Sequence, residues 1–240
     1  YPGISVAQAL LKRIPDAKCV FLCTQRPIDR TILDPTGFEY IPQPIVPPVR
    51  NIAGLLKFWN GWRETKDLIR RVRRERQPGA VLGLGGYAAG VAVKHCATHG
   101  IPAAIINPDV IPGKANQYLM RYASAVCCQF DRTRQHVPAS QHDKLRTTGC
   151  PVRAEILALP PRDEAARKLG LDPMLRTLVV TGASQGAQTV NEAVLTSLAT
   201  MKLQGWQVLH LAGKDHADAV RAGYRELPNV PARVIDFTAG

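Results

Sequence analysis

The stretch VLGLGGYAAG, residues 81–90, holds the features that decide how this chain folds: a short apolar run, a glycine-rich turn and the start of a helical pattern. The same order repeats along the chain. Short apolar runs lie at residues 19–23, 79–82, 103–106, 125–128, 177–180, 206–211 and 232–235. Segments with helical periodicity lie between most of them, at residues 4–14, 87–99, 112–121, 186–200 and 214–226. Continuously apolar strands that alternate with helices indicate a parallel sheet covered on both faces, so we predict a doubly wound α/β fold.

Two proline-rich segments interrupt this alternation. Residues 41–49 carry four prolines, and we expect a long loop there, because proline cannot donate a hydrogen bond to a central strand. The second segment runs from Pro151 to Pro161, after which the alternation begins again at Leu175. Proline clusters at such a break are typical of a domain boundary. We therefore predict a first domain over residues 1–155 and a second over residues 156–240.

Both ends of the chain fall inside the repeating pattern. The chain begins at Tyr1, directly before a helical segment, and stops directly after the apolar run at residues 232–235. The second domain has about three predicted strands, which is few for a doubly wound sheet. We therefore expect the chain to be a fragment that is truncated at both ends.

The composition is that of a basic globular protein. The chain has 31 Lys and Arg against 19 Asp and Glu, a net charge of +12, with 45% hydrophobic and 21% charged residues. Its six cysteines include no C-x-x-C pair, so we expect buried free thiols in a reducing cytosol instead of disulfides or a zinc site. No run of 18 apolar residues occurs, so we expect no membrane-spanning helix.

Two histidines, His95 and His99, are four residues apart on a predicted helix. No Glu follows His95, as the zinc-protease motif would require. We expect both histidines on the helix surface, and we expect neither a metal site nor another cofactor.

Two glycine-rich turns follow predicted strands, one in each domain. In the first, Gly83-x-Gly85-x-x-Ala88 fits the dinucleotide fingerprint formally, but it does not occupy the first strand–helix unit, where that fingerprint normally lies. The glycines either let backbone N–H groups approach an anion such as a diphosphate or only permit close packing of strand and helix.

The second turn, TGASQGA at residues 181–187, makes Ser184 and the surrounding amides candidates for binding a phosphate or a ribose. It lacks the Lys-Ser/Thr ending of a P-loop, which argues against ATP hydrolysis. Because ligands of open α/β sheets bind at this edge, the two turns together indicate a cleft between domains.

Residues 52–76 combine apolar, aromatic and basic side chains. Residues 63–76 include seven basic and three acidic residues, and Trp59 and Trp62 share one face of the predicted helix. Such a helix suits an anionic membrane surface, although a core-packed helix with a solvated basic face is the alternative. Nucleic-acid binding is disfavoured, because no nucleic-acid-binding module accompanies the charge. The predicted membrane contacts are Leu55, Leu56, Phe58, Trp59, Trp62 and Arg63.

Six motifs in this order resemble the MurG family of peptidoglycan glycosyltransferases, within glycosyltransferase family 28. They cover nearly the whole chain: YPG at 1–3, GLGGY at 83–87, IPAA at 101–104, PGKAN at 112–116, GCPVR at 149–153 and GASQGA at 182–187. The resemblance implies a GT-B fold of two Rossmann-like domains, with the second incomplete here. It also implies that the first strand and glycine loop of the N-terminal domain precede Tyr1.

The activity implied by this resemblance is inverting transfer of N-acetylglucosamine from UDP-GlcNAc to the 4-hydroxyl of undecaprenyl-diphospho-N-acetylmuramoyl-pentapeptide. This step of peptidoglycan synthesis serves cell-wall biogenesis, cell shape and division, at the cytoplasmic face of the bacterial inner membrane. The N-terminal domain would take the lipid acceptor, with Gly85, Gly86 and Tyr87 around its diphosphate. The C-terminal domain would take the UDP-sugar, and the implied donor-binding residues are Asp109, Arg153, Ser184, Gln185, Gly186 and Thr238.

The implied reaction is a metal-independent single displacement in which a base removes the proton of the acceptor hydroxyl. That base is not identified in this chain, because the candidate histidine of the family lies before Tyr1. We therefore expect the 240-residue chain to be inactive by itself.

One motif departs from the family pattern, which reads His-Glu-Gln-Asn where this chain has INPD at residues 106–109. Asp109 replaces an Asn that contacts the donor, and Asn107 replaces a carboxylate. An additional negative charge near a diphosphate should weaken donor binding unless Asp109 pairs with a cation.

Three alternatives remain open from the sequence. One is a related GT-B transferase with another lipid acceptor, such as a diacylglycerol. Another is a membrane-surface binding protein without catalysis, which the change at residues 106–109 permits. The third is a dinucleotide-dependent oxidoreductase.

Overall fold

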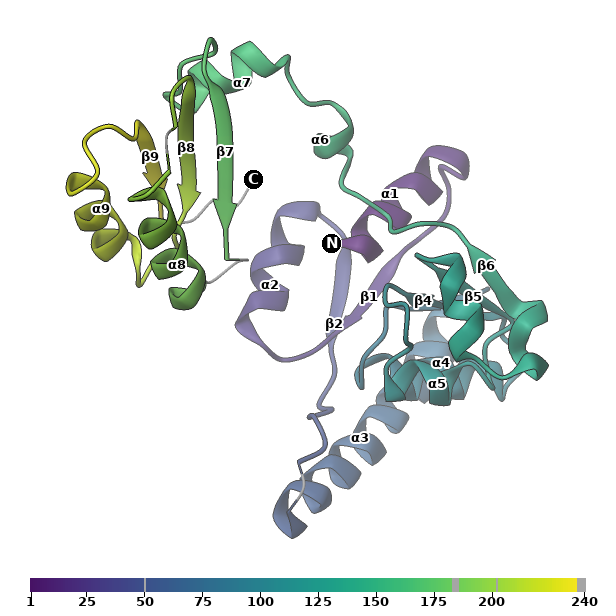
Figure 1. Cartoon of the computed structure of the whole chain (residues 1–240). Helices are drawn as coiled ribbons and strands as arrows, with labels where there is room; N and C mark the ends of the chain where they lie inside the picture. The colour runs from purple at the N-terminus through teal and green to yellow at the C-terminus, as the bar shows by residue number, and fades with distance from the viewer. Residues whose placement is uncertain (50, 183–185, 202, 237–240) are drawn as a thin grey trace. The chain divides into compact units, whose positions relative to one another are not determined.

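The structure is a computed structural model that describes residues 1–240 except 50, 183–185, 202 and 237–240. It divides into two compact units, Tyr1–Leu157 and Ala158–Gly240, and both combine parallel strands with helices (Figure 1). The predicted α/β class is therefore confirmed.

The first unit contains a two-stranded and a four-stranded sheet, and both are parallel. The strand orders are β1-β2 and β3-β4-β5-β6. Its helices are α1 (Pro2–Arg13), α2 (Pro27–Leu33), α3 (Ile52–Arg76), α4 (Ala89–Ala97), α5 (Lys114–Leu119) and α6 (Ala154–Leu157). Its strands are β1 (Val20–Cys23), β2 (Glu39–Pro42), β3 (Val81–Gly83), β4 (Ala103–Asn107), β5 (Ala125–Cys128) and β6 (Leu145–Thr147).

The core of the first unit lies on the four-stranded sheet. Val93 of α4 and Leu119 of α5 pack against Ile105 and Val126, which are fully buried on β4 and β5. Burial of such side chains contributes about 1.5–3 kcal/mol each. These contacts hold α4 and α5 next to the carboxyl ends of the strands, where the first glycine turn lies.

Two strands of the first unit were not predicted. β2 extends to Pro42, so the loop expected over residues 41–49 begins two residues later. Pro42 is tolerated because, among the described strands, β2 pairs only with β1 and is an edge strand. β6 has the sequence Leu-Arg-Thr, which is too short and too polar to form an apolar run.

The second unit contains a three-stranded parallel sheet in the order β7-β8-β9. Its elements are α7 (Arg162–Lys168), β7 (Arg176–Thr181), α8 (Gln188–Leu198), β8 (Trp206–Leu211), α9 (Ala217–Arg225) and β9 (Ala232–Ile235). The three strands confirm the three apolar runs predicted here. The core is formed by Val180, Val208 and Val220, with the α8 residue Leu198 beside them.

The structure tests the predictions made for the cysteines and for His95. All six cysteines are free thiols, but only Cys96 and Cys128 are buried as expected, and Cys150 is exposed. The prediction that His95 lies on the helix surface is wrong, because only 4% of this residue is exposed. The α4 helix that carries it is packed on β3 and α3 over most of its circumference. None of the helices in the described residues has the length and apolar character that a membrane span requires.

Candidate functional site

The long helix α3 carries one wall of the candidate site. It begins after Asn51, whose side chain accepts a hydrogen bond from the Gly54 N–H at 2.6 Å. The buried face of α3 includes Gly61 and Ile69, where the helix packs against the rest of the unit. Gly61 allows this approach, since a Cβ there would lie 2.8 Å from the Pro44 carbonyl oxygen.

The structure divides the six predicted membrane contacts into two groups. Leu55, Leu56, Trp59 and Arg63 are exposed, with 61% exposure at Leu56 and 58% at Trp59. Phe58 and Trp62 are half-buried and pack on the small cluster around Ile45, Ile69, Val91 and Ala92. Trp62 lies against α4, where a Cβ on Gly90 would be 3.3 Å from its indole ring. Phe58 and Trp62 therefore face the interior of the first unit, whereas the other four residues lie on the exposed surface of α3.

The first glycine turn combines close packing with an unusual backbone. A Cβ on Gly83 would lie 2.7 Å from the Val93 side chain, so this glycine serves strand–helix packing. Gly85 and Gly86 have φ angles of 90° and 72°, a region that side-chain-bearing residues rarely adopt. No atom lies within 4 Å of a Cβ built on Gly86, so its backbone borders open space. Close packing therefore explains Gly83, and anion binding by the turn stays a prediction, which concerns Gly85 and Gly86.

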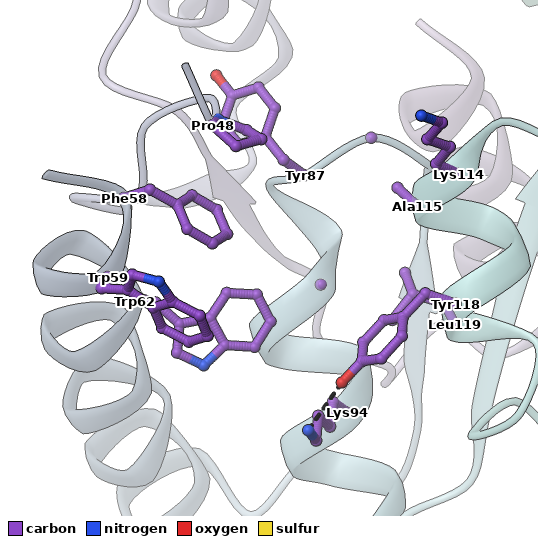
Figure 2. Close-up of a pocket in the computed structure, with 12 residues that line it drawn as sticks. Pro48, Phe58, Trp59, Trp62, Tyr87, Lys94, Lys114, Ala115, Tyr118 and Leu119 are labelled. Carbon is purple, nitrogen blue, oxygen red and sulfur yellow. Dashed lines mark hydrogen bonds between the residues drawn. The ribbon is translucent and has the colours of Figure 1, made fainter. Parts of the chain in front are cut away.

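A pocket of about 430 Å³ lies between α3, the glycine turn, α4 and α5. Figure 2 shows Phe58, Trp59 and Trp62 on one side of it, facing Tyr118 and Lys94 on the other. Its volume falls within the range of small-molecule sites. The lining is mostly apolar, and of the described residues that form it two are lysines and none is acidic. They are Pro48, Phe58, Trp59, Trp62, Gly86, Tyr87, Gly90, Lys94, Lys114, Ala115, Tyr118 and Leu119.

The ammonium of Lys94 is held by two tyrosines: Tyr118 lies on α5, and Tyr122 lies just after this helix. Lys94 Nζ donates a hydrogen bond to the Tyr118 hydroxyl at 2.7 Å. The same nitrogen lies 5.5 Å from the ring centre of Tyr118 and 5.4 Å from that of Tyr122. The hydrogen bond to Tyr118 raises the pKa of Lys94, and the same bond lowers the pKa of Tyr118. Lys94 is therefore a fixed cation in a mostly aromatic environment.

The INPD motif is ordered by amide side chains. Asn107 is fully buried at the end of β4, and its Nδ2 donates to the Asp109 carbonyl oxygen at 2.6 Å. Asn116 of α5 donates to the Asn107 Oδ1 at 3.0 Å, while its own Oδ1 is buried without a partner in the described part of the chain. Asp109 itself is exposed, and none of the ion pairs between described residues includes it. Among the described residues, no cation therefore forms an ion pair that would offset the charge of Asp109.

The remaining predicted donor residues are distributed over both units. In the first unit, the Arg153 guanidinium stacks on the Tyr1 ring at 4.7 Å. In the second unit, Gly186 has a φ of 74°, and a Cβ there would collide with the Ala212 carbonyl oxygen, so only glycine fits. Ser184, Gln185 and Thr238 lie outside the described residues.

Sequence reasoning did not assign a role to Lys94, Lys114 or Tyr118. Lys114 and Asn116 stand in the quoted PGKAN motif, but a motif does not show which side chains face a pocket. Lys94 had a weak signal, because it is a cation within the mostly apolar sequence of α4. Its partner Tyr118 is 24 residues away, so only the packing of α4 beside α5 brings them together.

Comparison with protein families gives two matches. Residues 1–128 match the glycosyltransferase family 28 N-terminal domain, and residues 177–239 match the glycosyltransferase family 28 C-terminal domain. These matches lie in the first and second unit of the structure, respectively.

Two curated relatives carry the name UDP-N-acetylglucosamine–N-acetylmuramyl-(pentapeptide) pyrophosphoryl-undecaprenol N-acetylglucosamine transferase. The protein of Bacteroides thetaiotaomicron is 30% identical over 99% of this chain and 64% of its own length. That of Bacillus licheniformis is 28% identical over 98% of this chain and 63% of its own length. The chain thus spans just under two thirds of the length of the curated relatives that it matches.

Solved structures with the same fold include a glycosyltransferase-type protein, MurG, and a sugar-nucleotide epimerase. MurG of Acinetobacter baumannii has a TM-score of 0.72 at 22% identity, covering 100% of this chain and 63% of that chain. A UDP-GlcNAc 2-epimerase of Neisseria meningitidis bound to UDP-GlcNAc has a TM-score of 0.61 at 15% identity, covering 93% and 64%. At these identities the likeness concerns the fold alone, and it confirms the predicted GT-B type of α/β architecture.

Proposed function

Because the chain belongs to glycosyltransferase family 28, we propose that its protein transfers N-acetylglucosamine from UDP-GlcNAc to a lipid-linked acceptor. The acceptor is undecaprenyl-diphospho-N-acetylmuramoyl-pentapeptide, and the new bond forms at its 4-hydroxyl. The names of the curated relatives support both substrates.

The observation that carries this proposal is the pocket of the first unit. It joins the Gly86–Tyr87 turn to the aromatic residues of α3, and two lysines stand in its lining. A diphosphate-linked lipid has the matching chemistry, because its anionic group needs cations or backbone N–H groups while its prenyl chain needs apolar surface. Gly85, Gly86 and Tyr87 bind the acceptor diphosphate in this proposal.

The second unit takes the UDP-sugar. The turn that contains Gly186 follows β7 and precedes α8, and backbone N–H groups in such a position stabilise the charge of a departing diphosphate. Arg153, Ser184, Gln185 and Thr238 complete the proposed donor site.

The exposed residues of α3 bind the cytoplasmic face of an anionic membrane. Leu55, Leu56 and Trp59 supply apolar surface, and the basic residues of the same helix contribute about 1 kcal/mol each near anionic lipid. The protein is therefore peripheral, and the acceptor reaches the pocket from the membrane surface beside it.

The decisive experiment is sugar transfer by the full-length protein. Labelled UDP-GlcNAc is offered with a soluble analogue of the lipid acceptor, and UDP-glucose and UDP-GalNAc compete as donors. We expect transfer selective for GlcNAc. Absence of transfer from every donor by folded protein contradicts the proposal, and transfer to a diacylglycerol instead identifies another lipid acceptor.

Replacement of Asp109 tests the departure in the INPD motif. Removing a negative charge near the donor diphosphate in Asp109→Asn should lower KM for UDP-GlcNAc by about threefold to tenfold. Asp16→Asn, which removes the same charge from an exposed loop, should leave KM unchanged. An unchanged KM in Asp109→Asn would remove Asp109 from the donor site.

A further inference from the structure

Lys94 has properties that distinguish it from the other basic residues of the first unit. It lies on α4, the helix that follows the glycine turn, and is half-buried. Most lysines extend the ammonium into water, whereas this one is fixed by the Tyr118 hydroxyl and two aromatic rings. Fixing it costs side-chain entropy, which an exposed lysine does not lose.

No carboxylate neutralises this cation within the described residues. The ion pairs found there involve neither Lys94 nor Lys114, and the pocket lining includes no acidic side chain. Tyr118, its hydrogen-bond partner, is neutral in its ordinary form. The pocket therefore presents uncompensated positive charge next to apolar walls, which suits an anionic amphiphile.

We propose that Lys94, positioned by Tyr118, binds the diphosphate of a polyprenyl diphosphate in this pocket, while Phe58 and Trp62 contact its first isoprene units. This inference rests on the proposed function and names a specificity-determining residue for its acceptor. The ammonium lies on one wall and the aromatic rings face it, as Figure 2 shows.

Two observations favour a prenyl diphosphate over the headgroup of an ordinary phospholipid. The pocket reaches from Lys94 to the Gly86 turn, so it offers two anion-binding elements, and a diphosphate has two phosphate groups to use them. The pocket also continues into the exposed part of α3 through Trp59, which lines it and is 58% exposed. A long prenyl chain has an apolar path along that side.

Tryptophan fluorescence measures this binding directly. Trp59 and Trp62 line the pocket, and Trp206 of the second unit supplies a constant background. Full-length protein is titrated with farnesyl diphosphate, a water-soluble prenyl diphosphate. Farnesol and inorganic diphosphate, which each carry one half of the ligand, should bind at least about tenfold more weakly.

Lys94→Met keeps the length and apolar stem of the side chain but removes its charge. We expect it to weaken farnesyl diphosphate binding by about tenfold or more, because hydrogen bonds between charged groups have at least that effect. Lys94→Arg should recover part of the affinity, and Tyr118→Phe should lose about threefold. Lys12→Met removes the same charge from an exposed position of α1 outside the pocket and should bind as the wild type does.

The same variants separate the prenyl ligand from a membrane headgroup. Binding to phosphatidylglycerol vesicles should change no more in Lys94→Met than in Lys12→Met. The inference is overturned if folded Lys94→Met binds farnesyl diphosphate as tightly as the wild type, or if its loss appears only with vesicles. Because binding is measured without UDP-GlcNAc, failure of sugar transfer and failure of the Lys94 site are distinguishable.

Discussion

Two buried histidines, one in each unit, are held in contrasting ways. His210 of β8 bonds on both ring nitrogens, to the Tyr224 hydroxyl at 3.1 Å and to the Asn191 Oδ1 at 3.0 Å. Asn191 in turn donates to the Ala212 carbonyl oxygen at 3.0 Å. His95 of α4 is also buried, but its Nε2 has no hydrogen-bond partner in the described part of the chain.

Other buried polar atoms of the first unit also lack hydrogen-bond partners within the described ranges, as His95 does. Thr65 Oγ1 and Arg73 Nε, both on α3, are also buried and lack partners among the described residues. Helix α3 packs on α4 through a cluster of apolar side chains. This contact leaves the polar atoms named above without hydrogen bonds to described residues. The second unit uses buried polar groups to fix its structure. The first unit tolerates unsatisfied groups where a helix carries the pocket and the proposed membrane contacts.

Replacing each histidine by leucine gives the largest expected difference. His210→Leu leaves Tyr224 and Asn191 without their shared partner in a buried site, and we expect a loss of about 2–3 kcal/mol. His95→Leu removes an unsatisfied nitrogen, so we expect a change within about 1 kcal/mol. Urea unfolding monitored by hydrogen exchange of the β8 and α4 amides reports on each unit separately.

Tyr224→Phe is the matched control for this pair, because it removes one hydrogen bond and keeps the ring. We expect a loss of about 1 kcal/mol, smaller than that of His210→Leu. Equal destabilisation by His210→Leu and His95→Leu would contradict the contrast between the units.

Acid should weaken the first unit through His95. Burial, followed by the charges of His99 and the α3 cations, lowers the pKa of His95 to about 4, against about 6.5 for an unperturbed histidine. The unfolded chain therefore takes up a proton that the folded chain refuses, and stability falls as the pH drops from about 6.5 to about 4. The α3 cations are Lys66, Arg70 and Arg73.

The measurement is the urea midpoint from Trp59 and Trp62 fluorescence in a Trp206→Phe background. The midpoint should be constant above pH 7 and should fall below pH 6.5, and His95→Leu should flatten this decline. Burial also lowers the pKa of His210, so the second unit should lose stability in the same direction. A slope unchanged by His95→Leu would mean that another group controls the acid sensitivity of the first unit.

A methyl group on Gly61 should loosen α3 from the first unit. The added Cβ would lie 2.8 Å from the backbone oxygen of Pro44, so the helix must shift, at a cost of about 1–2 kcal/mol. Gly79→Ala is the control, because nothing lies within 4 Å of a Cβ there. Thermal unfolding measures the change, and an equal response of both variants would show that Gly61 is not a close contact.

The smallest effect is expected at the surface of α3. Arg70 and Asp67 form an ion pair of 2.7 Å with both side chains largely exposed. Such pairs contribute little, so Asp67→Asn should change stability by less than about 0.5 kcal/mol. A larger loss by urea unfolding would indicate that the basic face of α3 takes part in packing.

Much of the fold could be predicted because local patterns carry it. The run at residues 232–235 coincides with β9, and the run at residues 206–211 coincides with β8. β6 was missed because its burial depends on a neighbouring strand and not on its own composition. The pocket was predicted only in part: Gly86, Tyr87 and the α3 aromatics were named, but the two lysines and Tyr118 were not.

The sequence by itself determined the alternation of strands and helices, the glycine turns and the basic aromatic character of α3, because each depends on residues close together in the chain. Only the tertiary structure decided which face of α3 is covered, and hence that Trp62 lines a pocket while Leu56 is exposed. It also decided that His95 is buried and that Lys94 meets Tyr118. A helical period defines a face, but the helix packed against that face determines whether its polar groups find a partner.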